Sequence, residues 1–563
     1  RAGGDRGRPR RLDRPMDGRR TGLNALPRWF VAAMAVPPVV FLGVFYVWPF
    51  ATLVARGLGV DAVADTLGRS ATWRVLWFTT WQAAASTALT LMIGLAPTWA
   101  VSRFTFPGRA ALVSVLTAVF VLPTVVVGAA VLAVLPDSLD HGIWAILGAH
   151  VVFNLAVVVR TVGAVWEQLP RDLDAAAATL GAGPTQVFRH VTLALLRPSL
   201  VAAGAIVFLF TFTSFGVVRV LGTPGRSTIE VEVWRRATQL GDVSGAAVLA
   251  LLQLAVLGGM VAWSTRAQRR ASRTIGLTGD QHRPGPAGRQ RWGVVASVGG
   301  TVALVGVPLL ALVERSLRVD GRYSFSAWRS LGDDRIRPGL RLGIDPVDAL
   351  QRSATTAIWA TLFAVVIGGA AIVAISALGR SGRWLDTGLM LPLGTSAVTI
   401  GFGMLITFDT APFDWRASWW LVPVGHALVA VPFVVRSAIG VVRGIGADRR
   451  AAAATLGADP IRAWTATTLP LLRRPLATGA GLAAAISLGE FGATSFLSRS
   501  GADTLPIAID RLLGRTGRLF QAQAFVLSTI LAAATVAIVL LVDRAGTSTG
   551  TSTSTGAGRA RRR

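Results

Sequence analysis

The 563-residue chain contains no cysteine and no lysine, and both absences exclude whole classes of chemistry. Without cysteine there can be no disulfide bond, thiolate nucleophile or cysteine-ligated metal. Without lysine the chain cannot form the Gly-rich phosphate loop that ends in Lys-Ser/Thr. Charged residues are also scarce, at 15%, whereas 52% of the residues are hydrophobic. This balance is typical of a membrane protein.

Apolar segments long enough to cross a bilayer recur along the whole chain. A helix needs about 20 apolar residues to span the hydrocarbon core. The sequence therefore predicts an all-α polytopic protein with about twelve transmembrane helices, six in each half. The predicted spans are 29–55, 75–101, 110–135, 142–166, 198–218 and 244–264, followed by 292–313, 354–378, 385–408, 417–442, 476–498 and 524–543.

The arginines indicate the orientation of the chain, because cytoplasmic segments are enriched in basic residues. Three segments are strongly basic: an N-terminal segment at 1–28, a linker at 265–291 and a polar tail at 544–563. We expect all three to be cytoplasmic, around two transmembrane domains at 29–264 and 292–543 of a cell-membrane protein. The formal charge of +27 is then mainly a topology signal. Nucleic-acid binding is not expected, since the basic stretches lack interleaved aromatics.

The two halves are related by an internal repeat. The stretch AAAATLGAGP that starts at Ala175 recurs as AAAATLGADP from Ala451, and His150 corresponds to His426 in the same register. The dipeptide Phe215-Gly216 likewise matches Phe491-Gly492. With six spans in each half, both halves enter the membrane in the same direction. They are parallel repeats related by an axis along the membrane normal.

The repeated stretch lies in the loop after the fourth span of each half. Its alanines favour helix, its glycine ends that helix, and its proline suits the first turn of the next. We expect a helix, a tight turn and a short helix lying across the membrane surface at about 184–192 and 460–468. A packed hairpin without a partner is the alternative, but a near-identical pair favours a docking surface. The predicted docking residues are Ala175, Ala176, Ala177, Gly181, Pro184 and Phe188, and Ala451, Ala452, Ala453, Gly457, Pro460 and Trp464.

These two loops resemble the EAA loops of the permeases of binding-protein-dependent ABC importers, a resemblance that extends over nearly the whole chain after about residue 28. The glycines of the family pattern are present, and Thr468-Leu469-Pro470 stands at its later Leu-Pro element. The family glutamate is replaced by Ala175 and Ala451, and Ala194 replaces the later proline in the first copy. The resemblance implies the MetI-like permease fold of type I importers. It also implies that each loop couples the permease to an ATPase subunit.

Partners follow from the same resemblance. We expect two ABC ATPase subunits on the cytoplasmic side, a solute-binding protein on the other side, and the lipid bilayer around the helices. The chain itself is not expected to be an enzyme or to carry a cofactor or metal, and ATP would be hydrolysed by the partner subunits. A twelve-span secondary transporter that is not driven by ATP remains the alternative.

Four residues are candidates for the substrate path. Glu490 is an acid inside an apolar span, which marks a functional site by default; a structural acid bonded between helices is the alternative. Its counterpart in the repeat is Ser214. His150 and His426 lie near the middle of their spans, where packing is the more frequent role for histidine than ligand binding. We expect the connection at 219–243 to face outward, either touching a binding protein or as a solvated amphipathic stretch.

The substrate is left open at this point. Fused double permeases are similar to the ferric-iron and thiamine transport group. The segments Thr228-Ile229-Glu230 and Ser487-Leu488-Gly489-Glu490 look more like the thiamine member. Molybdate and sulfate permeases share a similar Gly-Glu-Phe-Gly run, but they are usually chains of a single half.

Overall fold

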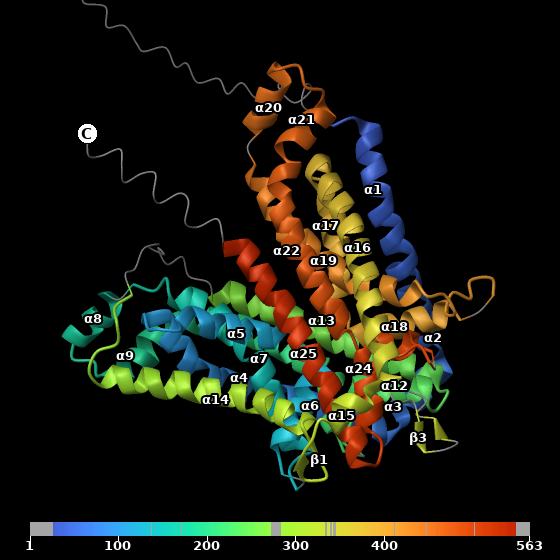
Figure 1. The fold of residues 1–563 in the computed structure, drawn as a ribbon. Coiled ribbons are helices and arrows are strands. Elements are labelled where there is room, and N and C mark those ends of the chain that lie inside the picture. The colour runs from blue at the N-terminus through green and yellow to red at the C-terminus, as the bar shows by residue number, and fades with distance from the viewer. Residues whose placement is uncertain are drawn as a thin grey trace, which may run out of the picture.

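The computed structural model describes residues 26–271, 283–332 and 345–547, apart from single positions at 137, 171, 224, 410, 446 and 500. It also describes the strand segments 335–337 and 340–341. Most of the basic segments predicted at 1–28 and 544–563 lies outside these residues, as do residues 272–282 of the linker predicted at 265–291. The described chain is almost entirely helical (Figure 1), with two small antiparallel ribbons, β1–β2 and β3–β4. The predicted all-α membrane fold is thereby confirmed.

The first half runs from α1 to α13. Its elements are α1 (Arg28–Leu42), η1 (Gly43–Val47), α2 (Trp48–Gly57), α3 (Val60–Gly68), α4 (Ser70–Arg103), α5 (Arg109–Val121), α6 (Thr124–Val134), α7 (Ile143–Trp166), α8 (Asp172–Thr179), α9 (Pro184–Val187), η2 (Phe188–Thr192), α10 (Leu193–Phe212), α11 (Gly216–Leu221), α12 (Ile229–Thr238) and α13 (Val243–Ala271).

The second half repeats this order after α14. Its elements are α14 (Arg289–Ser316), β1 (Arg318–Val319), β2 (Arg322–Tyr323), α15 (Ser326–Arg329), η3 (Ser330–Gly332), β3 (Arg335–Arg337), β4 (Leu340–Arg341), α16 (Pro346–Leu378), α17 (Gly382–Met390), η4 (Leu391–Gly394), α18 (Ala397–Thr407), α19 (Leu421–Gly444), α20 (Ala447–Thr455), α21 (Pro460–Thr467), α22 (Leu469–Gly489), α23 (Thr494–Leu497), α24 (Leu505–Leu513) and α25 (Arg518–Thr547).

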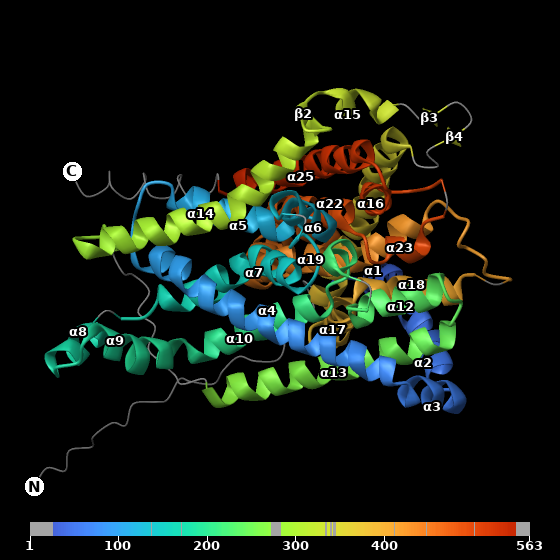
Figure 2. The same ribbon diagram turned by 90° about the horizontal axis from the view of Figure 1, so that it is seen from below.

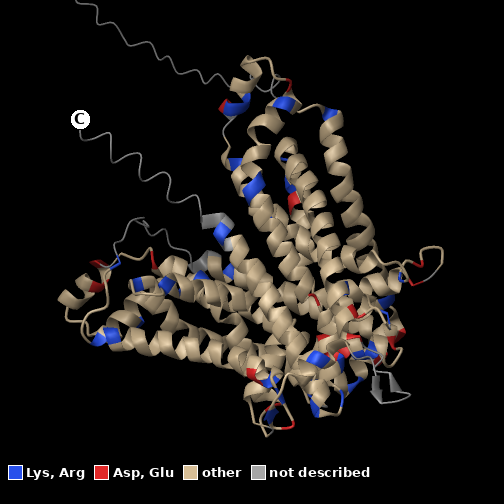
Figure 3. Cartoon of the chain, in the orientation of Figure 1, with Lys and Arg blue, Asp and Glu red and all other residues tan. Residues whose placement is uncertain are grey.

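By length and composition, nine helices within the described residues can cross a membrane, or up to eleven if each of two bent pairs is one span. Helix α22, at the predicted span 476–498, is not in that set; counted with it, the total reaches the predicted number of about twelve. Charged residues gather at the two ends of the helical arms, and the long stretches between them contain few of them (Figure 3). This distribution is what a hydrocarbon core requires.

Two predicted spans are not continuous helices. The segment predicted at 110–135 breaks between α5 and α6, whose axes differ by 108°, and the segment predicted at 385–408 bends by 99° before α18. Pro123 lies in the first break, and Pro392 lies in the short 3-10 turn η4 just before the second. Proline lacks the N–H of a continuing helix and disfavours helix in the residue before it. Hydropathy alone could not reveal these bends, because both pieces of each pair are apolar.

The first helix of each half packs against the opposite half. Helix α1 lies along α16 of the second half, and α14 lies against α4 and α6 of the first half (Figure 1). The side chains of the α1–η1 segment belong to the second hydrophobic core, and the Tyr46 hydroxyl is 2.7 Å from Thr395 Oγ1. This exchange ties the two arms of the molecule together. From the side seen in Figure 2, α14 again lies on the arm of the first half.

Candidate functional site: paired hairpins and a cavity between the halves

The first hairpin forms because a glycine ends α8 with a Schellman motif. Gly181 has φ +85°, a value that L side chains rarely adopt. Its N–H bonds to the carbonyl of Ala178 at 3.0 Å, and the N–H of Ala182 bonds to that of Ala177 at 3.1 Å. These two bonds satisfy carbonyls that the helix end leaves open. Pro184 then starts α9, as predicted.

The second hairpin has the same turn. Gly457 has φ +83°, and the bonds from Gly457 to Ala454 and from Ala458 to Ala453 measure 3.0 and 3.1 Å. Asp459 caps the next helix by accepting from the N–H groups of Ile461 and Arg462. The predicted helix–turn–helix shape is therefore present in both halves. The hairpins lie at the far ends of the two arms (Figure 1), on the side toward which α1 begins and α25 ends.

A leucine that the sequence analysis did not select stands at each turn. Leu180 and Leu456 occupy matching positions just before the two glycines, and each is 89% exposed. An isolated exposed leucine is ordinary, but two at equivalent tips of a repeat indicate contact surfaces. The signal was available in the sequence, since both lie inside the repeated stretch.

The predicted docking residues differ between the two hairpins. In the first, every helical residue of α8 has exposed surface, and Phe188 is half-exposed beside Trp166. In the second, Trp464 is 5% exposed and belongs to the core of its half. The alanines, glycines and prolines of both turns are exposed or half-buried: Ala175, Ala176, Ala177, Gly181, Pro184, Ala451, Ala452, Ala453, Gly457 and Pro460.

The prediction of a separate surface helix is wrong for the first half. Residues 184–212 form one continuous helix, because a π-helical turn at η2 joins α9 to α10 without a sharp bend. In the second half a single non-helical residue, Thr468, separates α21 from α22. In the first half, Ala175 replaces the glutamate of the family pattern. The residue before it, Asp174, forms an ion pair with Arg103 at the end of α4. Its repeat counterpart is Arg450.

A cavity of about 320 Å³ lies where the two halves meet. Much of its wall comes from four places where helices break, the α5–α6 and α17–α18 bends and the ends of α10 and α22, and residues of α7, α12, α13 and α19 complete it. Glycines allow this close approach, since a Cβ on Gly216 would stand 2.3 Å from Thr124 Oγ1 and one on Gly489 would stand 3.1 Å from Pro123. Broken helices that surround a cavity are the usual construction of a substrate site in transporters.

The matched phenylalanines of the repeat meet at this cavity. The rings of Phe215 and Phe491 lie 5.0 Å apart between centroids, with their planes inclined by 38°. Both side chains line the cavity, one from each half. The repeat thus places equivalent residues face to face at the boundary between the halves, as a two-fold arrangement requires.

Glu490 and Ser214, which the repeat pairs, both line the cavity. The carboxylate of Glu490 accepts from the Ala493 N–H at 2.9 Å and faces the N–H groups of Phe491 and Gly492. Its charge is therefore stabilised by the backbone of the break after α22. The backbone contact therefore supports the structural role that was considered for Glu490. Its position in the cavity wall also agrees with the predicted place of Glu490 in the substrate path.

Both histidines join helices within the halves and do not line the cavity. His150 Nδ1 is 2.9 Å from Ser86 Oγ and its Nε2 is 2.9 Å from Ser214 Oγ. His426 lies 2.8 Å from Ser487 Oγ and 2.7 Å from Thr494 Oγ1. Each ring is buried with both nitrogens bonded, which is the geometry of a packing residue.

Comparison with known proteins identifies the family. Residues 92–273 match the family described as the binding-protein-dependent transport system inner membrane component. A Salmonella typhimurium protein named as a 2-aminoethylphosphonate transport system permease, PhnV, is 31% identical over 198 residues, which cover 74% of its length and 35% of this chain. The chain belongs to this permease family.

Longer relatives extend the likeness over both halves of the permease. The thiamine transport system permease protein ThiP of Brucella abortus (strain 2308) is 28% identical over 524 residues, covering 88% of this chain and 91% of that protein. ThiP of Escherichia coli (strain K12) is 27% identical over 464 residues, covering 78% and 84%. The chain is thus a fused double permease of an ABC importer, which decides against the secondary transporter.

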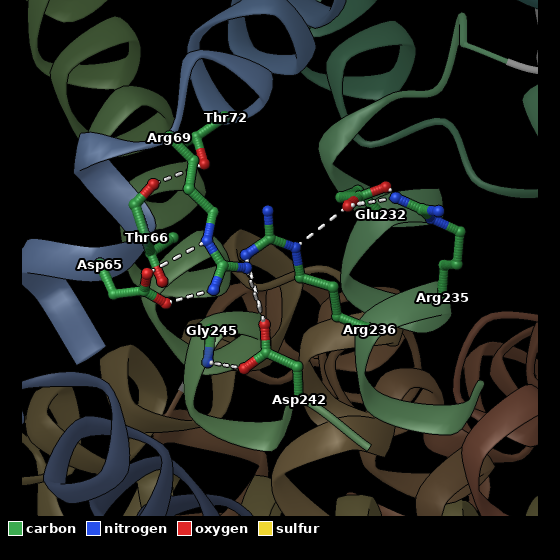
Figure 4. A network of polar contacts seen from close by, with 9 residues as sticks. All are labelled: Asp65, Thr66, Arg69, Thr72, Glu232, Arg235, Arg236, Asp242 and Gly245. Atoms are coloured by element: carbon green, nitrogen blue, oxygen red, sulfur yellow. Dashed lines mark hydrogen bonds and ion pairs between the residues drawn. The ribbon is translucent and has the colours of Figure 1, made fainter. Parts of the chain in front are cut away.

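The connection at 219–243 of the permease is not a solvated stretch, so that alternative is wrong. Glu232 and Arg236 are almost fully buried, and Glu232 accepts from Arg236 Nε at 3.0 Å and from Arg235 at 2.8 and 2.9 Å. Arg236 also reaches Asp242, at 3.5 Å (Figure 4). This network fastens α12 to the start of α13, and Arg69 of the α3–α4 corner joins it through Asp242 at 3.8 Å.

Replacing His426 with alanine is expected to lower the free energy of unfolding of the permease by about 1–3 kcal/mol, and with it the melting temperature. The reason is that the hydroxyls of Ser487 and Thr494 lose their buried partner. Melting of the purified protein, followed by size-exclusion chromatography with tryptophan fluorescence, measures this. His190→Ala is the matched control, since His190 is exposed on η2 and bonds to the Gln186 carbonyl at 3.1 Å. Equal melting temperatures for the two variants would contradict the assigned role.

Proposed function

We propose that this permease imports thiamine, receives it from an extracytoplasmic solute-binding protein, and couples to two ATPase subunits through its two hairpins. The observation that carries the coupling is the matched pair of exposed leucines at identical Schellman turns. Two equivalent surfaces at the ends of the two arms suit a symmetric pair of partner subunits. ATP is hydrolysed in those subunits, and closure of the pair would move one half against the other.

The proposed orientation puts the hairpins and both termini in the cytoplasm. The start of α1 and the end of α25 lie toward the hairpin side of the molecule (Figure 1), as an even number of spans requires. The arginine-rich segments predicted at 1–28 and 544–563 would continue from these ends, in agreement with the enrichment of basic residues in cytoplasmic segments. The opposite end, with α12, α24 and the β1–β2 ribbon, would then receive the binding protein.

Thiamine is favoured among the substrates by the relatives and by the cavity. The relatives that cover both halves are named as thiamine permeases. Glu230 and Glu490 are the only ionisable side chains that line the cavity within the described residues, and both are acids. Such a lining suits a cation such as thiamine better than the phosphonate named for the half-length relative.

Uptake into proteoliposomes tests this function. Vesicles that contain the permease and its ATPase subunits, with the binding protein added outside, are expected to accumulate labelled thiamine only when ATP is enclosed. Omission of the binding protein or of ATP should reduce uptake to background. Labelled ferric iron and 2-aminoethylphosphonate serve as competing substrates, and ATP-driven uptake of either without thiamine uptake would refute the proposed substrate.

A further inference from the structure

Glu230 is an acid that lines the central cavity yet is completely buried, with 0% exposure. It comes from α12 of the first half, whereas Glu490 comes from the second half. In the repeat Glu230 corresponds to Pro506, and Glu490 corresponds to Ser214. Each half therefore supplies one acid that the other lacks, and both acids line the same cavity.

The carboxylate of Glu230 is only partly satisfied by the protein. Its Oε1 accepts a hydrogen bond from Gln253 Nε2 on α13, and the Ser396 side chain lies nearby. Its Oε2 is buried without a hydrogen-bond partner among the described residues. A desolvated carboxylate oxygen without a partner is unfavourable unless a positive group meets it. Glu490 differs, because its carboxylate is already held by the backbone after α22.

The position of Glu230 is fixed by the helix that carries it. Glu232, two residues later, points to the other side of α12 and enters the ion network with Arg236 and Asp242 (Figure 4). On a helix, residues two apart do not face each other. Anchoring Glu232 in that network therefore directs Glu230 toward the cavity and limits rotation of α12.

The rest of the wall is aromatic and apolar. Phe215 and Phe491 meet there, and Phe153, Phe210 and Phe433 add three further rings. Phenyl faces attract cations, and flat rings pack well among them. A volume of about 320 Å³ is in the range of pockets that hold one small organic molecule.

We propose that the cavity is a selective binding site for one aromatic organic cation, with Glu230 as the residue that meets the positive charge. This proposal rests on the proposed function and extends it: the permease itself, and not only the binding protein, distinguishes the charged ring from neutral rings of similar shape. Glu230 acts as the counter-charge, and the contacting pair Phe215 and Phe491 forms an aromatic wall against which the ring packs.

Equilibrium binding to the permease–ATPase complex without the binding protein tests this site. The probes are labelled thiamine, which carries a thiazolium cation, and thiochrome, its neutral fluorescent ring-closed derivative. Wild-type protein is expected to prefer thiamine, and Glu230→Gln is expected to reduce that preference at least tenfold, with partial recovery in Glu230→Asp. Glu314→Gln is the matched control: it makes the same carboxylate-to-amide change on α14, where Glu314 forms a half-exposed ion pair with Arg318 outside the cavity, and it should keep the wild-type preference.

The outcomes separate this site from the proposed function. If wild-type vesicles import thiamine but Glu230→Gln keeps the full preference for the cation, the site is refuted and the function stands. If the wild-type complex prefers the cation in a Glu230-dependent way but vesicles import no thiamine, the site stands and the proposed substrate is refuted. Thermal melting accompanies each variant. If Glu230→Gln is unfolded, the preference of Glu230→Asp decides: an unaltered preference with reduced affinity for both probes alike would overturn the proposal.

Discussion

Aspartate in place of both Leu180 and Leu456 is expected to detach the ATPase subunits and to reduce ATP-driven uptake to background. Each leucine is almost fully exposed in the permease alone. If each is covered by a partner subunit, its burial contributes about 1.5–3 kcal/mol. Loss of both contacts weakens assembly by roughly two orders of magnitude or more, and a buried unpaired carboxylate at each site adds a further penalty.

Copurification of the ATPase with affinity-tagged permease measures this effect directly. Leu240→Asp is the control, since Leu240 is also exposed but lies beside the α12 network, away from the hairpins. The double variant should melt at the wild-type temperature, because neither leucine packs inside the permease. Normal copurification with the double variant would refute the docking role of the hairpins. The two single variants show how much each hairpin contributes to ATPase binding. The hairpins differ in their neighbouring aromatic residue, since Phe188 is exposed and Trp464 is buried.

The hairpins could be predicted from sequence because their cause is local. A run of alanines, a glycine and a proline at fixed spacing dictates a helix, a left-handed residue and a new helix start, whatever surrounds them. Gly181 and Gly457 accordingly have the positive φ that this pattern requires. The number of spans and the parallel repeat were likewise accessible, since both depend on composition along the chain.

The cavity could be predicted only in part, because it is made by contacts between distant segments. Glu490 stood out as an acid within an apolar run. Glu230 did not, since the polar segment Thr228–Thr238 reads as a solvated amphipathic helix. The segment is buried because Gln253 of α13 bonds to one oxygen of Glu230 and because Glu232 and Arg236 pair with each other. The hydrophobic periodicity of the sequence does not reveal such contacts between distant segments.

The bends after α5 and before α18 were missed for a different reason. Their prolines were visible, but proline is tolerated inside membrane helices when neighbours satisfy the freed backbone groups. Pro198 and Pro432 lie within continuous helices, whereas Pro123 lies at a break. Whether a proline breaks its helix depends on the segments that pack against it. At the α5–α6 break, the close contacts of Gly216 and Gly489 stabilise the broken conformation.

Valine at Gly401 is expected to disrupt the cavity and abolish uptake. A Cβ at this position of α18 would stand 2.6 Å from Ala493 Cα and 2.7 Å from the Ala493 carbonyl oxygen. These are backbone atoms, so no side-chain rotation relieves the clash, and the break after α22 must shift. That shift removes the Ala493 N–H from the Glu490 carboxylate, which accepts it at 2.9 Å.

Overpacking of this kind costs typically about 1–3 kcal/mol, so both the melting temperature and thiamine binding should fall in Gly401→Val. Gly401→Ala should show a smaller loss in the same direction. Gly369→Ala on α16 is the control, since nothing lies within 4 Å of its Cβ position and alanine favours helix over glycine by about 1 kcal/mol. Wild-type melting and uptake in Gly401→Val would mean that α18 does not lie against the Ala493 backbone. Because Glu490 depends on that same backbone, its place in the cavity wall would then have to be reassigned.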